Sequence, residues 1–189
     1  MTDTTAIATA QAEIRRRVAA IGAGQWDLPT PCTDWSVTDL VVHLIAGSAM
    51  TVLLLEGASG PESLSPFRAP HGPDLEAELD RGLTDELAAF GKPDALDTIV
   101  HHPAAGDVPG SALFGFRTGD YLLHSWDLAR ATGGDEALDE TLVVTTWEAM
   151  QPMAPFIAEI GIFGAGPSGT VGADAPLQQR LLDFTGRRP

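Results

Sequence analysis

The stretch between Ser36 and Glu56 constrains the fold more than any other part of the sequence. Ser36 is followed three residues later by Asp39, a pattern typical of a helix N-terminus whose first residues cap each other. The residues that follow, up to Gly57, are apolar nearly all round a helix. A helix of this kind is normally surrounded by other elements. We therefore expect it to be buried.

The rest of the chain predicts further helices. Apolar residues at helical spacing, with glycine or proline at the ends, predict helices over residues 5–22, 74–90, 111–132 and 137–160, and a short last helix from Asp174 to Gly186. The helix over 137–160 is expected to break around Pro152 and Pro155. We find no convincing run of strands. The fold class predicted is all-α, in a single domain over residues 1–189.

Two connections, residues 57–73 and 91–110, are long and rich in proline and glycine. Loops of this length are uncommon in compact domains and often cover a functional site. We therefore expect them to form walls around whatever this protein binds.

Composition excludes several classes of function. The net charge of -15 argues against nucleic acid or an anionic membrane as a partner, since both require clustered Lys and Arg. The single cysteine, Cys32, excludes an internal disulfide and fits a reducing cytoplasm. Polar or small residues, including His43 and Gly47, interrupt the longest apolar run, so we do not interpret it as a membrane span. The polar N-terminus predicts no signal peptide.

Asp120 and His124 carry the strongest chemical signal. They are four residues apart on a predicted helix, so they share one face and can converge on one metal ion. His43, inside the buried helix, supplies a third ligand if the two helices face each other. Three protein ligands with a free fourth position are the pattern of a catalytic metal. The alternative, that His43 is a core histidine bonded to a carbonyl or carboxylate, stays open.

Other polar residues allow more than one interpretation. Asp127 either accepts a hydrogen bond from a ligand imidazole or pairs with Arg130. Cys32 has no histidine beside it in the sequence, so a role as nucleophile is disfavoured. We expect the tryptophans to pack in the core or against loops: Trp26, Trp35 and Trp126. We expect the remaining histidines to be exposed to solvent: His71, His101 and His102.

Two segments together resemble the DinB-like metal-binding superfamily: residues 35–44 (WSVTDLVVHL) and 124–133 (HSWDLARATG). With residues 30–32 (TPC) and 180–187 (RLLDFTGR), they are similar to the actinobacterial branch related to the N-terminal domain of mycothiol-dependent maleylpyruvate isomerase. The resemblance implies a DinB-like four-helix bundle over about residues 5–132, with long crossover loops and additional C-terminal helices over about 137–187.

The same resemblance implies a divalent metal, zinc or nickel, held by His43, Asp120 and His124. Asp120 stands where the related isomerase usually has glutamate. The implied function is a metal-dependent enzyme that uses a low-molecular-weight thiol such as mycothiol in transferase or isomerase chemistry on a small electrophile. The alternative is a non-catalytic metal-binding or stress-related interaction protein. Whether the chain forms a homodimer is left open.

Overall fold

The computed structural model describes residues 3–155, 157, 161, 163 and 166–189. The helices are α1 (Thr5–Ala19), α2 (Val37–Leu55), α3 (Gly60–Ser63), α4 (Leu75–Phe90), α5 (Gly110–Thr132), α6 (Glu140–Met150) and α8 (Leu177–Phe184), with 3-10 turns at Ser65–Arg68 and Gln151–Met153. The prediction of a mainly helical chain is confirmed.

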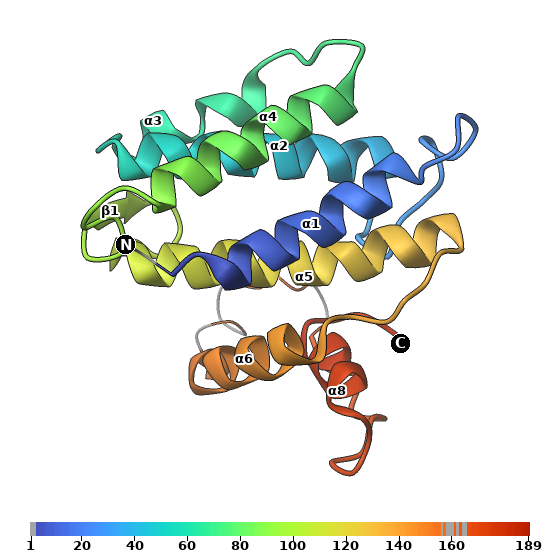
Figure 1. The fold of residues 1–189 in the computed structure, drawn as a ribbon. Coiled ribbons are helices and arrows are strands. Elements are labelled where there is room, and N and C mark those ends of the chain that lie inside the picture. Colours follow the sequence, from blue (N-terminus) through green and yellow to red (C-terminus); the bar gives the residue numbers. More distant parts are fainter. Residues whose placement is uncertain (1–2, 156, 158–160, 162, 164–165) are drawn as a thin grey trace.

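The four long helices pack in two pairs. α2 lies on α4, α1 lies on α5, and contacts of α1 with α4 and of α2 with α5 join the pairs (Figure 1). α6 packs against α5, and α8 packs against α6. Apolar side chains of all four long helices form the core, among them Ile14, Leu44, Leu83 and Trp126. This packing brings the polar residues of α2 and α5 together.

Local chemistry sets the ends of α2 and α5. Asp39 donates its backbone N–H to the Ser36 hydroxyl at 3.2 Å, and the Asp39 carboxylate accepts the Ser36 backbone N–H at 2.9 Å. This is the reciprocal cap that the sequence predicts for α2. α5 ends at Gly133, whose φ of 72° lies in the left-handed region that glycine enters without steric cost.

α2 is long and apolar enough to cross a membrane by length and composition alone. However, 61% of its most apolar window is buried inside the protein, against α4 and α5 among other elements. A core helix passes the same test, so packing inside the protein accounts for the apolar character of α2.

The structure corrects the expectation that the chain has no strands. β1 (Ile99–His102) and β2 (Gly106–Pro109) form an antiparallel hairpin in which His102 lies opposite Gly106. Only Val100 is buried in β1, so the alternation of a half-buried strand is too short to be visible in the sequence.

The helix predicted over 137–160, with a break around Pro152 and Pro155, begins as α6 at Glu140 and is interrupted near the first of these prolines. α6 ends at Met150, and a 3-10 turn takes up Pro152, near the predicted break. Part of this prediction falls on residues 156 and 158–160, which lie outside the described residues.

Candidate functional site

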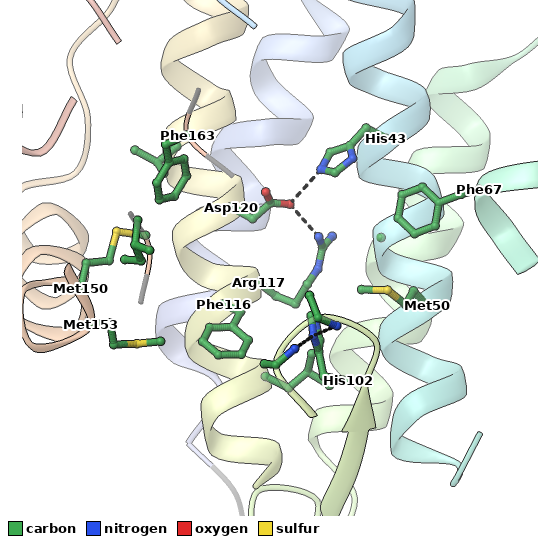
Figure 2. Close-up of a pocket in the computed structure, with 16 residues that line it drawn as sticks. His43, Met50, Phe67, His102, Phe116, Arg117, Asp120, Met150, Met153 and Phe163 are labelled. Atoms are coloured by element: carbon green, nitrogen blue, oxygen red, sulfur yellow. Dashed lines mark hydrogen bonds and ion pairs between the residues drawn. The ribbon is translucent and has the colours of Figure 1, made fainter. Parts of the chain in front are cut away.

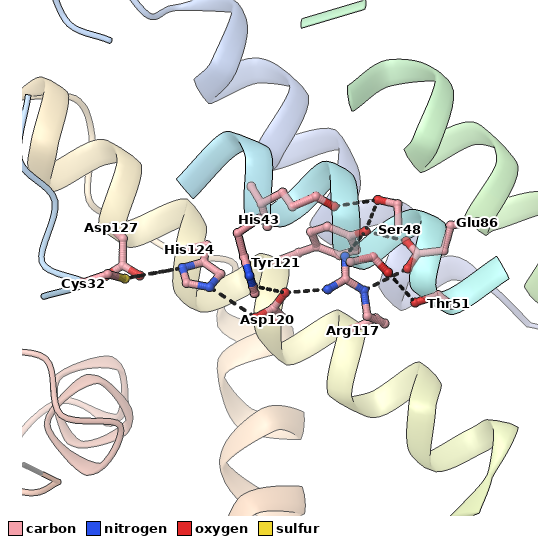
Figure 3. Close-up of polar contacts among 12 residues, drawn as sticks. Cys32, His43, Ser48, Thr51, Glu86, Arg117, Asp120, Tyr121, His124 and Asp127 are labelled. Carbon is pink, nitrogen blue, oxygen red and sulfur yellow. Dashed lines mark hydrogen bonds and ion pairs between the residues drawn. The ribbon is translucent and has the colours of Figure 1, made fainter. Parts of the chain in front are cut away.

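His43, Asp120 and His124 meet where α2 faces α5. Nε2 of His124 lies 3.2 Å from Oδ1 of Asp120, one helical turn away on α5. Nε2 of His43, on α2, lies 3.6 Å from Oδ2 of the same carboxylate. The three donor atoms are all within 4.8 Å of one another (Figure 3). The carboxylate therefore stands between two imidazoles that come from different helices.

Arg117 holds Asp120 from the other side. Its Nη1 donates to Oδ2 of Asp120 at 2.6 Å, and its Nε donates to Glu86 at 2.9 Å. Its Nη2 donates to the hydroxyl of Tyr121 at 2.6 Å, and this hydroxyl donates to Glu86 at 2.5 Å. Glu86 and Tyr121 are completely buried and Arg117 nearly so. Each buried charge is thus paired, which offsets the cost of removing it from water.

Gly47 provides the space for this guanidinium. A Cβ atom at position 47 would lie 2.9 Å from Cζ of Arg117, closer than side chains approach one another. The missing side chain at position 47 therefore lets Arg117 of α5 pass α2 and reach Glu86 on α4.

Asp127 holds the other ring nitrogen of His124. Nδ1 of His124 lies 2.9 Å from Oδ2 of Asp127. Arg187, near the C-terminus, donates to both oxygens of Asp127, from Nη2 at 2.7 Å and from Nε at 3.2 Å. The alternative pair of Asp127 with Arg130 is not formed, since Arg130 pairs with Glu136 at 2.7 Å.

Burial and pairing have opposite effects on the pKa values of these groups. Burial raises the pKa of Asp120, but the adjacent imidazoles and Arg117 lower it well below its usual range. Burial lowers the pKa of His124, but the charge of Asp120 and hydrogen bonds to Asp120 and Asp127 raise it well above its usual value. Burial likewise raises the pKa of Asp127, yet His124 and Arg187 lower it to about 2. Both carboxylates are therefore ionised at neutral pH.

Cys32 and Trp35, from the loop before α2, lie beside the donor cluster: Cys32 next to His124, and Trp35 next to both imidazoles. Sγ of Cys32 lies 3.4 Å from Oδ2 of Asp127 and 3.9 Å from Nδ1 of His124. The ring centroid of Trp35 lies 4.8 Å from that of His43 and 6.1 Å from that of His124. The proximity of Cys32 to His124 could not be read from the sequence, because the two residues are 92 positions apart. Cys32, His124 and Asp127 form a second donor group, although Arg187 already engages Asp127.

An apolar cavity of about 260 Å³ adjoins His43, Asp120 and Arg117. Figure 2 shows Asp120 between His43 and Arg117, with apolar side chains on both sides. The apolar side chains of its wall include Met50, Phe67, Leu113, Phe116, Leu123, Met150, Met153, Ile157 and Phe163. Both long connections contribute, residues 57–73 through Phe67 and residues 91–110 through the hairpin.

The remaining histidines lie outside the donor cluster. His71 and His101 pair with nearby carboxylates. His102 was expected to be exposed to solvent, but it is half-buried and lines the cavity. Its Nδ1 accepts the backbone N–H groups of Ala104 and Ala105 at 3.2 and 3.0 Å, and burial lowers its pKa.

Three charged residues that support the site were not predicted from the sequence: Arg117, Glu86 and Arg187. Arg117 had a local signal, because it stands three residues before Asp120 on the same helix face. The pairing of Glu86 had no local signal, because its partner Arg117 lies 31 residues away in the sequence. Arg187 belongs to the segment 180–187 that carries the resemblance, but its pairing with Asp127, 60 residues away, has no local signal either.

Comparisons with known proteins give two kinds of similarity in sequence. The sequence model of the family described as "Mycothiol maleylpyruvate isomerase N-terminal domain" matches residues 7–129. An uncharacterized protein of Mycobacterium tuberculosis, found in two strains, is 34% identical over 177 residues, which is 90% of this chain and 89% of that relative.

Solved structures add a similarity in fold. The crystal structure of the mycothiol-dependent maleylpyruvate isomerase has a TM-score of 0.64 at 14% sequence identity, and that of a mutant has 0.63 at 13%. Each comparison covers 81% of this chain and 70% of the solved chain. At this level of identity the likeness shows a shared fold.

Proposed function

Because this chain belongs to the family of the mycothiol maleylpyruvate isomerase N-terminal domain, we propose that it is a metal-dependent enzyme that uses a low-molecular-weight thiol. Membership confirms the resemblance found in the sequence. The observation that carries the proposal is the placement of three donor side chains, His43, Asp120 and His124, beside an apolar cavity. Such a cavity is where a small substrate would meet the ion.

The donor set fits a divalent ion. Two ligands of one ion, each bound at about 2.0–2.2 Å, stand roughly 3–3.6 Å apart. Nε2 of His124 lies 3.2 Å from one oxygen of Asp120, and Nε2 of His43 lies 3.6 Å from the other oxygen, so each imidazole stands at this spacing from the carboxylate. Imidazole and carboxylate ligands suit zinc and nickel. Asp127 orients the ring of His124 through its second nitrogen, as outer partners of metal-bound histidines usually do.

The packing of α1, α2, α4 and α5 supports a finer assignment of the fold. We assign these helices to a DinB-like four-helix bundle over about residues 5–132. Residues 137–187 would form a helical extension of the same single domain. In such bundles, metal sites are made by inward side chains of facing helices, as α2 and α5 are here.

A bound divalent ion would supply a Lewis acid that favours the thiolate form of a thiol whose unperturbed pKa is about 8.5. The protein's own residues prepare the site: Arg117 orients Asp120, and Asp127 orients His124. The thiol proton would leave to solvent, and the thiolate sulfur would bond to one carbon of a conjugated carbon–carbon double bond in a small electrophile. The π bond would open, and its electron pair would take up a proton from solvent, which gives the thioether of a transferase. In isomerase chemistry the same carbon–sulfur bond would break again after rotation about the opened bond, which releases the thiolate. Mycothiol is our first candidate, because the enzyme of similar fold is mycothiol-dependent.

The test is to replace the native ion with cobalt and add mycothiol. Thiolate ligation should give a sulfur-to-metal charge-transfer band in the near ultraviolet, and His43→Ala should give none. If azide changes the cobalt spectrum but millimolar thiol produces no band, the thiol-dependent enzyme is rejected. The non-catalytic metal-binding or interaction protein then becomes the better assignment.

A further inference from the structure

We propose that the electrophile bound in the cavity is apolar and uncharged, and that the cavity does not take a dicarboxylate. The inference rests on the proposed function, in which a thiolate occupies the free metal position. It follows from the charges and surfaces that a substrate would meet in the remaining space.

The described lining of the cavity offers no uncommitted cation. Among the described residues that line it, Arg117 is the only Lys or Arg. Its single positive charge faces the carboxylates of Glu86 and Asp120, and each of its three nitrogens already donates to a protein oxygen. A substrate carboxylate would therefore be buried without a positive partner, which is costly.

Of the three connecting segments that contribute to the wall, residues 57–73 carry one arginine, Arg68, which is exposed and is not among the described lining residues. The other two segments add no positive charge. Residues 151–166 (QPMAPFIAEIGIFGAG), which contribute Met153 and Phe163 to the wall, contain one Glu and no Lys or Arg. Residues 99–109 (IVHHPAAGDVP), which form the hairpin, also lack Lys and Arg. With a net charge of -15, the whole protein repels a dianion rather than attracting it.

The wall itself suits an apolar group. Methionines from α2 and from the C-terminal side face each other across the space, together with Phe116 and Phe163 (Figure 2). Methionine adapts its shape to irregular apolar ligands and makes favourable contacts with aromatic rings. The volume of about 260 Å³ lies just below the range of about 300–1,000 Å³ found for small-molecule pockets. We therefore infer a single small apolar body.

His102 indicates which polar group the substrate can carry. Its Nδ1 accepts two backbone N–H groups, so the neutral ring carries its hydrogen on Nε2. Burial favours the neutral form. A neutral N–H donor suits the carbonyl oxygen of an uncharged aldehyde, ketone or ester.

The test uses saturated analogues that cannot react with thiol. The zinc-loaded protein, with saturating 2-mercaptoethanol in the free metal position, is titrated with 4-phenyl-2-butanone, 3-phenylpropanoate and succinate in a calorimeter. The ketone should bind at least about tenfold more tightly than 3-phenylpropanoate, and succinate should not bind. Binding of either carboxylate as tight as that of the ketone would overturn the inference.

A charge placed in the wall provides the matched comparison. Met153→Arg should tighten binding of 3-phenylpropanoate at least about tenfold, because the carboxylate then has a partner. Val144→Arg, which adds the same charge at an exposed position of α6 outside the cavity lining, should change nothing. Equal effects of the two variants would show that the ligand binds elsewhere. The wild-type titration remains decisive if Met153→Arg does not fold.

The two proposals fail separately. A cobalt–thiolate band together with a preference for carboxylates would overturn the substrate class and leave the thiol-dependent enzyme intact. Tight binding of the ketone without such a band would overturn the enzyme and leave an apolar ligand site.

Discussion

At the scale of single residues, Asp120 connects the donor cluster with the buried charges. One of its oxygens faces His124, while the other faces His43 and accepts from Arg117. Arg117 fixes the carboxylate in the direction of both imidazoles. The aspartate side chain reaches both imidazoles, because α2 and α5 bring the rings to it.

The two imidazoles are expected to be indispensable for metal retention. His43→Ala should lose the ion, since one of three protein ligands is removed and no described carboxylate replaces it within the donor group. His71→Ala is the matched control, because His71 pairs with Glu78 outside the cluster. Metal content is measured by mass spectrometry after dialysis. Equal content in wild type and His43→Ala would reject the site.

Asp127 is expected to act on the metal through His124. Asp127→Asn should weaken zinc binding by about 10–100-fold, because the imidazole loses a charged partner and Arg187 loses its own. Arg130→Gln removes a charge that pairs with Glu136 and should leave the affinity unchanged. Competition with a chelating dye measures both. If Asp127→Asn bound zinc as tightly as the wild type, Asp127 would have a role only in packing and in the ion pair with Arg187.

How far the sequence predicted these residues depends on their distance along the chain. Asp120, His124 and Asp127 share one helix face, so spacing alone groups them. Cys32 and Arg187 reach the same group only through folding, and local pattern contains no information about such contacts.

At the scale of elements, the approach of α5 to α2 depends on a glycine. Arg117 passes the position where residue 47 would carry a side chain and reaches Glu86 beyond it. An interior glycine destabilises α2 by about 0.5–1 kcal/mol relative to alanine, and the contact between Arg117 and Glu86 offsets this loss.

Two glycine substitutions separate the effect of helix propensity from the effect of the space that Arg117 needs. Gly115→Ala, exposed on α5 with open space around it, should stabilise the protein by about 0.5–1 kcal/mol through helix propensity. Gly47→Ala should instead destabilise it by about 1–3 kcal/mol, because the methyl group displaces Arg117 from its partners. Urea unfolding measures both. Equal stabilisation by the two alanines would show that Arg117 is not held in place.

Helices could be predicted better than their connections. The cap at Ser36 and the end of α5 at Gly133 depend on adjacent residues, so they are visible in the sequence. The hairpin depends on pairing between β1 and β2, each four residues long, and most of its side chains are exposed. Its role as a wall of the cavity follows from packing against α2 and α5, which no local pattern encodes.

At the scale of the whole molecule, the site joins segments that are far apart in the sequence. α2 supplies His43, and α5 supplies Asp120 and His124 (Figure 3). Arg187, near the C-terminus, donates to Asp127. An ion held by both helices would cross-link the two packed pairs, since α2 packs with α4 and α5 with α1. Metal binding should therefore be coupled to the stability of the entire fold.

Zinc is expected to stabilise the native protein according to its free concentration. At 100 times the dissociation constant, the free energy of unfolding should rise by about 2.7 kcal/mol, because the ion binds the folded chain and not the unfolded one. Urea unfolding with buffered zinc and with a chelator measures the difference. His43→Ala should show no zinc-dependent change, and Asp127→Asn should need about 10–100-fold more free zinc for the same effect. An equal response in His43→Ala would place the ion elsewhere, for example on exposed carboxylates of this acidic chain, and would separate metal binding from the contact between α2 and α5.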